Sequence, residues 1–505
     1  MSRVQQPGWT AAALFTLTVV TRLPFQSQTL YHWDSVNLAF GALRFDVLAE
    51  APQFPGYIVY VALVQAVQTL TADPQRAMTL ISLLSSGLAV AALYGLGRMM
   101  FSPAVGLAAA LFLWGSPLAW FYSVVALPHM LDLLLVITAA GLLYRIHAGR
   151  ARWLWWVAIF LALVGGVRQQ TLIFVLPLAL FSIWRMGWYR VLLFGLLVGA
   201  ASLAWFLPLI AFSGGLGPYL TGSSVYSARF FDTTSVLAGA GWPGVRRNLL
   251  KLIPYTLYGW AFAVLPAAVG MFRFRAIRLD GRAGFLAVWC APALAFYAFI
   301  HMGQQGLVLV FLPALLLASA AALEVNARAR GWRMWGTVGG IALAGAALFV
   351  GFPTYPLGEN GPKLLTYDTI QAQDRWMLGR IAAIRGHFDP RTTLLLASNW
   401  RFVQYYLPEY AFARFGIGAK WETNAGQPDG VDFAGRLVAA PQLGLDDSAG
   451  WQVVIVDDGL LAFAAAPMQV MKREGESGTA LAYLQLRPGE RYWTDGATFG
   501  AQPAP

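Results

Sequence analysis

Residues 73–101 read DPQRAMTLISLLSSGLAVAALYGLGRMMF. Between Arg76 and Arg98 this stretch carries no charged side chain, so its uncharged run covers residues 77–97. An α-helix needs about 20 mainly apolar residues to cross the hydrocarbon core of a bilayer. The stretch therefore predicts a membrane-spanning helix with a basic residue at each end.

Comparable apolar runs recur throughout the first 352 residues. We predict about eleven membrane-spanning helices, at residues 9–25, 77–97, 103–122, 130–146, 153–167, 171–185, 191–212, 252–272, 284–300, 305–323 and 334–352. The composition agrees, because 58% of the 505 residues are hydrophobic and 12% are charged, whereas a soluble domain carries about 25% charged residues. The chain is thus predicted to be an α-helical polytopic membrane protein in a lipid bilayer.

The basic residues indicate how the helices are oriented. They gather at alternate ends of the predicted spans, as Arg3, Arg98, Arg145, Arg150, Arg152, Arg185, Arg190, Arg273, Arg275, Arg278, Arg282, Arg328, Arg330 and Arg333. Under the positive-inside rule these ends are cytoplasmic, which predicts a cytoplasmic N-terminus. The same rule explains the pI of about 9.8, and we therefore expect no nucleic-acid partner.

This alternation requires that residues 55–70, PGYIVYVALVQAVQTL, do not cross the membrane. The segment is short for a span and contains Gln65 and Gln68, so a helix lying in the outer interface fits it better. The outer face then receives a long first loop (about 26–76), a second loop (about 213–250) and the chain from Phe352 onward.

The last part of the chain changes character. Residues 353–505 hold 13 basic and 16 acidic residues, which leaves 22 basic and 8 acidic residues for the first 352. Strand-length apolar runs, TTLLLASN (392–399) and WQVVIVDD (451–458), alternate with a helical pattern at residues 367–385. We predict a transmembrane domain at 1–352 and a small extracytoplasmic α/β domain at 353–505.

Several function classes have no support in the sequence. The one cysteine, Cys290, lies in an apolar run, so neither a disulfide framework nor a thiolate metal cluster can form. The sequence has no P-loop, no dinucleotide-binding fingerprint in a βαβ context, no HExxH motif and no GxSxG motif.

Asp34 is the acidic residue best placed for chemistry. It follows the first predicted helix in TLYHWDSVNLAF, between aromatic residues typical of a membrane interface. A carboxylate in a partly dry cleft can act as a general base on a hydroxyl group. A helix cap or a solvated loop charge is the alternative for Asp34, because Ser35 and Asn37 are also capping residue types.

The motifs WDSVN (33–37) and PQFPGY (52–57) resemble the start of the GT-C glycosyltransferases, in particular the protein O-mannosyltransferase and lipid-linked aminoarabinose transferase group with its bacterial relatives. In that group an acidic residue follows the first helix, and a turn such as HPPGY opens the next segment. Weaker similarity continues in residues 73–101, in VRQQTLIFVLPL (167–178) and in GQQGLVLVFLPALLLA (303–318). The His of the family's first motif is absent here, and Gln53 and Phe54 replace its His–Pro pair, which leaves the substrate class open.

The resemblance implies a GT-C-like fold with interfacial helices in the first loop, and a hexosyl- or pentosyltransferase of the cell envelope in the bacterial inner membrane. The donor would be a polyprenyl-phosphate-linked sugar, and the acceptor a hydroxyl group of a lipid, a polysaccharide or a protein. Transfer would be inverting, on the extracytoplasmic side, with Asp34 as the general base.

A phosphate-bearing donor needs cations on the outer side. Basic residues predicted there, against the positive-inside trend, are Arg76, Arg168, Arg229, Arg246, Arg247, Lys251 and His301. Guanidinium groups pair well with phosphate oxygens. Each of these residues could instead meet a phospholipid head group or a backbone carbonyl.

Four further residues are expected at or beside the acceptor: Asp46, His129, Asp132 and Tyr57. His129 and Asp132 lie three apart, so they share a helix face and form either a buried hydrogen-bonded pair or half of a divalent-metal site completed by Asp34 or Asp46. Asp132 could also orient an arginine or an acceptor hydroxyl, and Asp46 could be a solvated loop charge.

Two other classes of function remain as alternatives. One is a transporter or flippase of lipid-linked sugars, although such proteins usually carry internal repeats and charges at the bilayer midplane. The other is a noncatalytic scaffold that presents the tail. We expect a glycosyltransferase with no certain cofactor.

Overall fold

The computed structural model describes residues 7–272, 281–327, 331–353, 364–415, 436–465, 468–472, 480–494 and 498–502. The predicted cytoplasmic residues Arg3, Arg273, Arg275, Arg278, Arg328 and Arg330 lie outside these ranges. The chain forms two compact units. We call Met1–Ser27, Gly41–Val47 and Pro52–Ile370 the membrane unit, and Gln28–Phe40, Leu48–Ala51 and Gln371–Pro505 the tail unit. Two pieces of the first loop thus belong to the tail unit. The predicted division of the chain into functional domains at residues 352/353 stays a prediction.

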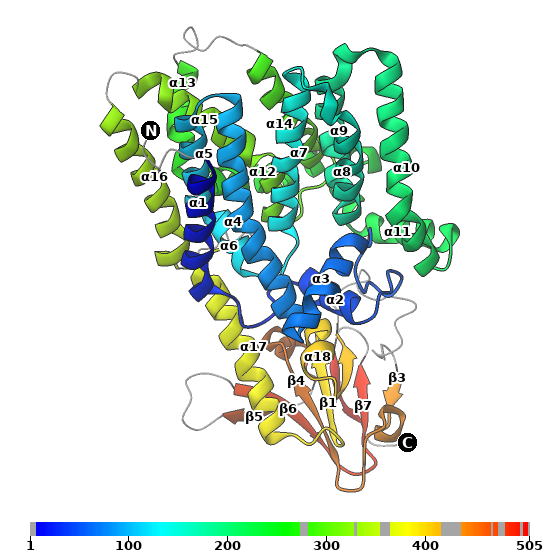
Figure 1. Ribbon diagram of the computed structural model, residues 1–505. Coiled ribbons are helices and arrows are strands. Elements are labelled where there is room, and N and C mark those ends of the chain that lie inside the picture. Colours follow the sequence, from blue (N-terminus) through cyan, green and yellow to red (C-terminus); the bar gives the residue numbers. More distant parts are fainter. Residues whose placement is uncertain are drawn as a thin grey trace. The chain divides into compact units, whose positions relative to one another are not determined.

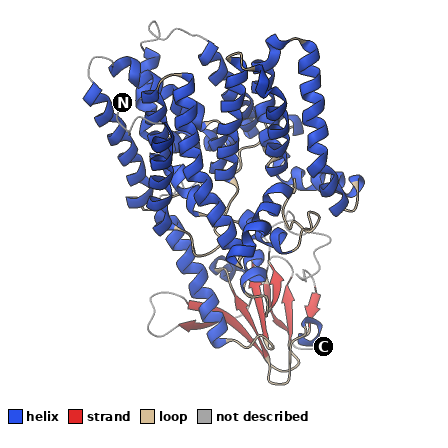
Figure 2. Ribbon diagram, viewed as in Figure 1, coloured by secondary structure: helices blue, strands red, loops and turns tan. Residues whose placement is uncertain are grey.

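The membrane unit consists almost entirely of helices in its described part (Figure 1, Figure 2). They are α1 (Pro7–Arg22), α3 (Ile58–Thr71), α4 (Pro74–Met100), α5 (Pro103–Gly115), α6 (Pro117–Val124), α7 (His129–His147), α8 (Leu154–Val167), α9 (Gln169–Ile183), α10 (Trp188–Phe212), α11 (Leu216–Phe231), α12 (Gly241–Trp260), α13 (Val264–Phe272), α14 (Gly281–Phe299), α15 (Leu312–Ala327) and α16 (Gly331–Gly351). Each predicted span overlaps one of these helices or a consecutive pair, and residues 305–323 also include a 3-10 helix, Gln305–Val310.

Seven helical stretches in the described ranges are long and apolar enough to cross a membrane. The pair α5 and α6 adds an eighth if it is one span, and the two helices meet at a bend of 62°. The chain is therefore an integral, multi-pass membrane protein. Helix α3 has 14 residues and is about 21 Å long, shorter than the hydrocarbon core of about 30 Å, as expected for an interfacial helix.

Three helices of this unit begin with the same local device, a polar residue followed by proline. Asp73 caps α4 by accepting hydrogen bonds from the backbone N–H of Gln75 and Arg76. Ser102 and Ser116 cap α5 and α6 in the same way. Proline suits the first helical position because its fixed φ matches the helix and its missing N–H is not needed there. The Ser116–Pro117 pair therefore starts a new helix and explains the bend between α5 and α6.

Basic helix ends that the positive-inside rule groups together do lie together. The guanidinium of Arg282, at the start of α14, lies 5.6 Å from the centre of the Phe101 ring, just after α4. His147, at the end of α7, stacks on Phe181 near the end of α9, with ring centres 5.2 Å apart. The ends of α4, α7 and α9 and the start of α14 thus belong to one end of the membrane unit.

The tail unit contains two sheets and two helices in its described part. The helices are α17 (Tyr367–His387), most of which lies in this unit, and α18 (Trp400–Tyr406); the residues Trp33–Phe40 of α2 (Trp33–Leu43) also belong here. The strands are β1 (Thr393–Ala397), β2 (Ala411–Arg414), β3 (Arg436–Val438), β4 (Trp451–Ile455), β5 (Gln469–Lys472), β6 (Ala480–Leu486), β7 (Arg491–Thr494) and β8 (Phe499–Gln502).

The larger sheet has the order β2-β1-β4-β6-β5, in which β1 pairs in parallel with β2 and β4. Alternation of side chains along β1 sends Leu395 toward α17 and α18, and sends Leu394 and Leu396 into the core shared with the small sheet β3-β7-β8. The result is a helix layer, a mixed sheet and a second sheet (Figure 2). The prediction of a helical membrane region with a small C-terminal α/β region is thus confirmed.

Candidate active site

Asp34 lies in the first turn of α2, within the tail unit. Its side chain is 24% exposed, and its Oδ2 lies 3.8 Å from Nδ1 of His32. The same His32 nitrogen accepts a hydrogen bond from the backbone N–H of Asp34 at 3.1 Å. Asp34 is therefore a partly accessible carboxylate at the start of a helix.

The PQFPGY motif forms a tight turn in the membrane unit. The backbone N–H of Gly56 bonds to the carbonyl of Gln53 at 3.0 Å. Gly56 has φ +108°, and a Cβ atom there would lie 2.6 Å from Cδ1 of Leu209, so the position suits only glycine. Tyr57 follows in the left-handed region and ends the turn at the start of α3.

Two side chains hold this turn. The carbonyl oxygen of Pro55 accepts hydrogen bonds from Nε2 of Gln169 and from the hydroxyl of Tyr219, both at 3.2 Å. Phe54 packs in a buried cluster with Val47, Leu209 and Tyr219. Asp46, half-buried next to Val47, lies in the same unit. Neither Gln169 nor Tyr219 was predicted, because no local pattern indicates which distant residue meets the turn.

Asp132 and Arg168 form a buried ion pair. Nη1 of Arg168 lies 3.1 Å from Oδ2 of Asp132, and the two side chains are 9% and 3% exposed. Arg168 occupies the break between α8 and α9, next to Gln169, and Tyr57 and Tyr297 lie within electrostatic range of it. The predicted residues Tyr57, Asp132 and Arg168 are therefore brought together, with Asp132 orienting an arginine.

His129, one turn before Asp132, packs differently. Its ring centre lies 4.4 Å from that of Tyr122, whose hydroxyl accepts a hydrogen bond from the backbone N–H of Gly306 at 2.8 Å. A Cβ atom on Gly306 would come within 2.2 Å of Cδ2 of His129. The histidine thus fills a tight contact against the segment before α15. In the described part of the chain, no three His, Cys, Asp or Glu side chains gather as a metal site would require.

Three of the predicted cations form a second group, which we call the basic cluster: Arg247, Lys251 and His301. Nη1 of Arg247 donates to Oγ1 of Thr233 at 3.0 Å, and Nδ1 of His301 lies 3.1 Å from Oγ1 of Thr234. Burial and the nearby charges of Lys251 and Arg247 lower the pKa of His301 to about 4. At neutral pH His301 is therefore an uncharged hydrogen-bonding group.

Asn248 holds the basic cluster in shape. Its Nδ2 donates to the carbonyls of Thr234 and Ala298, and its Oδ1 accepts from the backbone N–H of Met302. The remaining predicted cations, outside the buried pair and the basic cluster, are Arg76, Arg229 and Arg246. Arg76 and Arg246 are exposed, and the guanidinium of Arg229 lies 5.6 Å from the centre of the Tyr226 ring.

A chain of rings connects the turn with the basic cluster. Phe54 lies 5.8 Å from Tyr226, Tyr226 lies 5.3 Å from Phe230, and Phe230 lies 5.5 Å from His301, measured between ring centres. Gln169, next to Arg168, contacts the other side of the turn through Pro55. The PQFPGY turn is therefore linked by contacts both to the residue next to the buried ion pair and to the basic cluster.

An apolar groove begins beside this turn. It has a volume of about 580 Å³ and is lined by Phe45, by residues of α3 and by residues of α10. Ile58 and Val59, which directly follow Tyr57, contribute to one wall, and Ala204 and Trp205 to the other. Gln65 is the one polar side chain in the lining. Such a groove suits a long hydrocarbon chain.

The fold is shared with solved structures of membrane transferases. ArnT from Cupriavidus metallidurans, a lipid-linked aminoarabinose transferase, matches over 94% of this chain and 98% of its own, at 14% identity, with TM-scores of 0.57 in the apo state and 0.56 bound to undecaprenyl phosphate. An oligosaccharyltransferase from Archaeoglobus fulgidus, in the apo form, matches over 90% of this chain and 70% of its own, at 12% identity and a TM-score of 0.50.

Both of these proteins are GT-C superfamily members. The predicted resemblance to that group is thereby confirmed at the level of the fold, and the chain has the GT-C fold. No family model matches the sequence, and no curated protein sequence matches it.

Proposed function

We propose that this protein is a membrane glycosyltransferase that moves a sugar from a polyprenyl-phosphate donor to an acceptor hydroxyl on the extracytoplasmic side. The acceptor oxygen bonds to the anomeric carbon while the bond from that carbon to the phosphate oxygen breaks. Polyprenyl phosphate leaves, the hydroxyl proton passes to the carboxylate of Asp34, and the anomeric configuration inverts.

The observation that carries the proposal is the apolar groove between α3 and α10. A volume of about 580 Å³ lined mainly by apolar side chains suits an isoprenoid chain better than a soluble nucleotide sugar. The shared fold supports the same donor class, because one structure with that fold, at 14% identity, holds undecaprenyl phosphate.

The donor phosphate needs cations near the mouth of the groove. Arg168 is a candidate because its neighbour Gln169 bonds to the turn that leads into the groove. The ion pair with Asp132 engages Nη1 of Arg168, and a guanidinium has five N–H donors. The basic cluster is the second candidate, with Arg247 exposed at its edge. In this proposal Asp132 orients Arg168, and Tyr57 lies beside the bound phosphate.

Transport of a lipid-linked sugar is the alternative function. The Asp132 and Arg168 pair is the feature that favours it, because buried charges within membrane helices often mark transport pathways. A transporter would move the donor across a vesicle membrane and leave its glycosidic bond intact, whereas a transferase releases polyprenyl phosphate.

The test uses the full-length protein reconstituted in vesicles. Undecaprenyl-phosphate-linked hexoses and pentoses are supplied with a cell-envelope lipid extract as the acceptor, and released undecaprenyl phosphate is measured. We expect release with at least one donor, and loss of at least a hundredfold of that rate in Asp34→Asn, which keeps the shape of the side chain but cannot take up the proton. Full activity of Asp34→Asn would remove Asp34 from the mechanism, and donor movement without release would favour transport.

A further inference from the structure

The segment that carries Asp34 is fastened to two helices of the tail unit. The carboxylate of Asp374, on α17, accepts hydrogen bonds from the backbone N–H of Gln28 at 2.9 Å and of Thr29 at 2.8 Å, and from Oγ1 of Thr29 at 2.6 Å. The hydroxyl of Tyr406, on α18, accepts one from the backbone N–H of Leu30 at 2.7 Å. Two side chains of the tail thus bind three consecutive backbone amides.

The beginning of α2 docks on α18 through one face. Trp33 and Phe40 are seven residues apart, which is about two helical turns, so their side chains point the same way. The Trp33 ring meets Trp400 edge-on, with centres 5.5 Å apart, and the Phe40 ring meets Tyr405 at the same separation. Asp34 is one residue on from Trp33 and is therefore turned by about 100° from this face.

Arg401 is a third residue that holds the first-loop pieces in place. Its guanidinium lies 5.3 Å from the centre of the Phe40 ring, and its Nη2 donates to the carbonyl of Ala49, in the other first-loop piece of this unit. The residue is 4% exposed, and burial lowers its pKa to about 10 although the charge of Glu50 opposes the shift. It remains a cation at neutral pH, so both first-loop pieces are held by one charged side chain.

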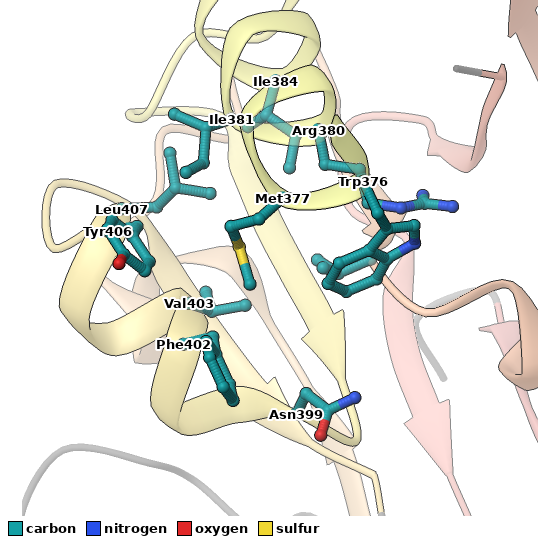
Figure 3. Close-up of a pocket in the computed structure, with 11 residues that line it drawn as sticks. Trp376, Met377, Arg380, Ile381, Ile384, Asn399, Phe402, Val403, Tyr406 and Leu407 are labelled. Carbon is teal, nitrogen blue, oxygen red and sulfur yellow. The ribbon is translucent and has the colours of Figure 1, made fainter. Parts of the chain in front are cut away.

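The two helices that hold the segment pack against each other through apolar side chains. Figure 3 shows the side chain of Met377 on α17 pointing toward Val403 of α18. The space left between the helices is about 10 Å³, which is about the room that one water molecule needs. This contact is therefore packing and not a ligand pocket, and it fixes Asp374 relative to Tyr406.

The helix pair is also tied to the sheet. The carboxylate of Asp457, just after β4, accepts hydrogen bonds from the backbone N–H groups of Ser398 and Asn399 and from Nδ2 of Asn399, at the start of α18. Arg380 of α17 pairs with the adjacent Asp458. The direction of α2, and with it the direction of the Asp34 carboxylate, therefore follows from the α/β part of the tail.

We propose that Asp374, Tyr406 and Arg401 are positioning residues, which hold the first-loop segment 28–40 so that Asp34 faces the reacting hydroxyl. This inference rests on the proposed function for the role of Asp34. It gives the tail unit a part in catalysis, through the position of Asp34. A displacement of about 1 Å in a catalytic group can cost about a hundredfold in rate, so a hydrogen bond far along the sequence is enough to matter.

Four variants of the full-length protein test the proposal. Asp374→Ala removes the acceptor of three hydrogen bonds, whereas Asp374→Asn keeps one of the two accepting oxygen atoms. Tyr406→Phe removes a single oxygen atom, and we expect this variant to fold like the wild type. The matched control is Glu409→Gln, which breaks an ion pair with Arg385 beside the same helices without involving segment 28–40.

Hydrogen exchange at the amides of residues 28–30 gives a readout independent of activity. We expect exchange at these amides to be at least tenfold faster in Asp374→Ala, faster at Leu30 in Tyr406→Phe, and unchanged in Glu409→Gln. Unchanged exchange in the first two variants would overturn the proposal. This result is separate from the role of Asp34 as the base, which falls if Asp34→Asn keeps full activity. It is also separate from the transferase function, which falls if the wild type moves the donor without releasing undecaprenyl phosphate.

Steady-state kinetics then separates positioning from binding. We expect kcat to fall between tenfold and a hundredfold in Asp374→Ala, with partial recovery in Asp374→Asn, while KM for donor and acceptor stays within about twofold. A raised KM with unchanged kcat would overturn the proposal, because the tail would then bind acceptor without positioning Asp34.

Discussion

Nη1 of Arg168 lies 3.1 Å from Oδ2 of Asp132, inside the helices of the membrane unit, where both side chains are almost fully buried. Asp132 belongs to α7, and Arg168 stands in the break between α8 and α9. The pair therefore fixes the point at which α9 begins and at which Gln169 reaches the PQFPGY turn. Each charge is stabilised mainly by the other, because neither side chain is exposed to water.

Removing one partner of this pair should destabilise the protein strongly. We expect Asp132→Asn or Arg168→Gln alone to lower the free energy of unfolding by about 3 to 5 kcal/mol, because each leaves an uncompensated buried charge. The double variant should lie closer to the wild type, because no charge remains buried. Equilibrium unfolding in mixed detergent and SDS measures these differences.

The control is the exposed pair of Asp389 and Arg391, whose N···O distance of 3.0 Å is similar. Asp389→Asn should leave the free energy of unfolding close to that of the wild type, because water screens exposed pairs. A double variant that loses as much stability as the sum of the singles would contradict the explanation by buried charge.

Protonation of His301 should make stability depend on pH. Its pKa is lowered to about 4 in the folded protein, first by burial and then by Lys251 and Arg247, while an unfolded histidine has a pKa of about 6.5. Between these two values the unfolded chain binds more protons, so stability falls as the pH drops from about 6.5 to about 4.

Replacing His301 by Gln tests this directly. Between pH 6.5 and pH 4 the free energy of unfolding should fall less in His301→Gln than in the wild type. The slopes against pH should differ by no more than the slope that one bound proton produces. Stability above pH 7 should show no such difference in slope. Identical slopes in the two proteins over the acid range would mean that His301 is not the titrating group.

Local sequence patterns predicted the helices and strands well, but they could not predict the contacts between distant segments. The uncharged run at residues 77–97 lies within α4, and the apolar runs in the tail became β1 and β4, because hydrophobic period and length are local properties. Asp132 and Arg168 were predicted for separate roles, acceptor and donor phosphate, since nothing in two segments 36 residues apart indicates that they pair.

The first loop shows the same limit more sharply. The sequence predicted Asp34 from its position after the first helix, and the structure does place it on a helix with a partly exposed side chain. That Thr29 bonds to Asp374, 345 residues away, could not be predicted, because Asp374 lies in an ordinary amphipathic helix pattern. Its role in catalysis, like that of the other candidate site residues, stays a prediction.

Arg247 should contribute to donor affinity through its charge. It is the exposed guanidinium of the basic cluster, bonded to Thr233, and a hydrogen bond to a charged partner is worth about 1.5 to 3 kcal/mol. We expect Arg247→Gln to raise the Kd for labelled undecaprenyl phosphate by about tenfold or more, and Arg247→Lys to raise it less. Arg44→Gln, which removes an exposed cation of the first loop that is not among the predicted phosphate-binding residues, is the matched control and should change the Kd less than twofold. An equal effect of both variants would mean that only general attraction to the membrane surface is involved.

Filling the apolar groove should block the lipid chain of the donor. Ala62 on α3 and Ala204 on α10 line opposite walls, and a tryptophan at either position adds a large rigid side chain to a space of about 580 Å³. We expect Ala62→Trp and Ala204→Trp to raise the Kd for labelled undecaprenyl phosphate at least tenfold, because overlap with the bound chain removes its buried apolar contacts. Ala211→Trp is the control, since Ala211 is an exposed residue of the same helix α10 outside the groove lining, and its Kd should stay within about twofold.

A water-soluble short-chain isoprenyl phosphate sharpens the comparison, because its binding depends on the phosphate contacts more than on the groove. If the tryptophan variants weaken the short and the long ligand equally, the groove does not hold the chain, and the donor must lie elsewhere.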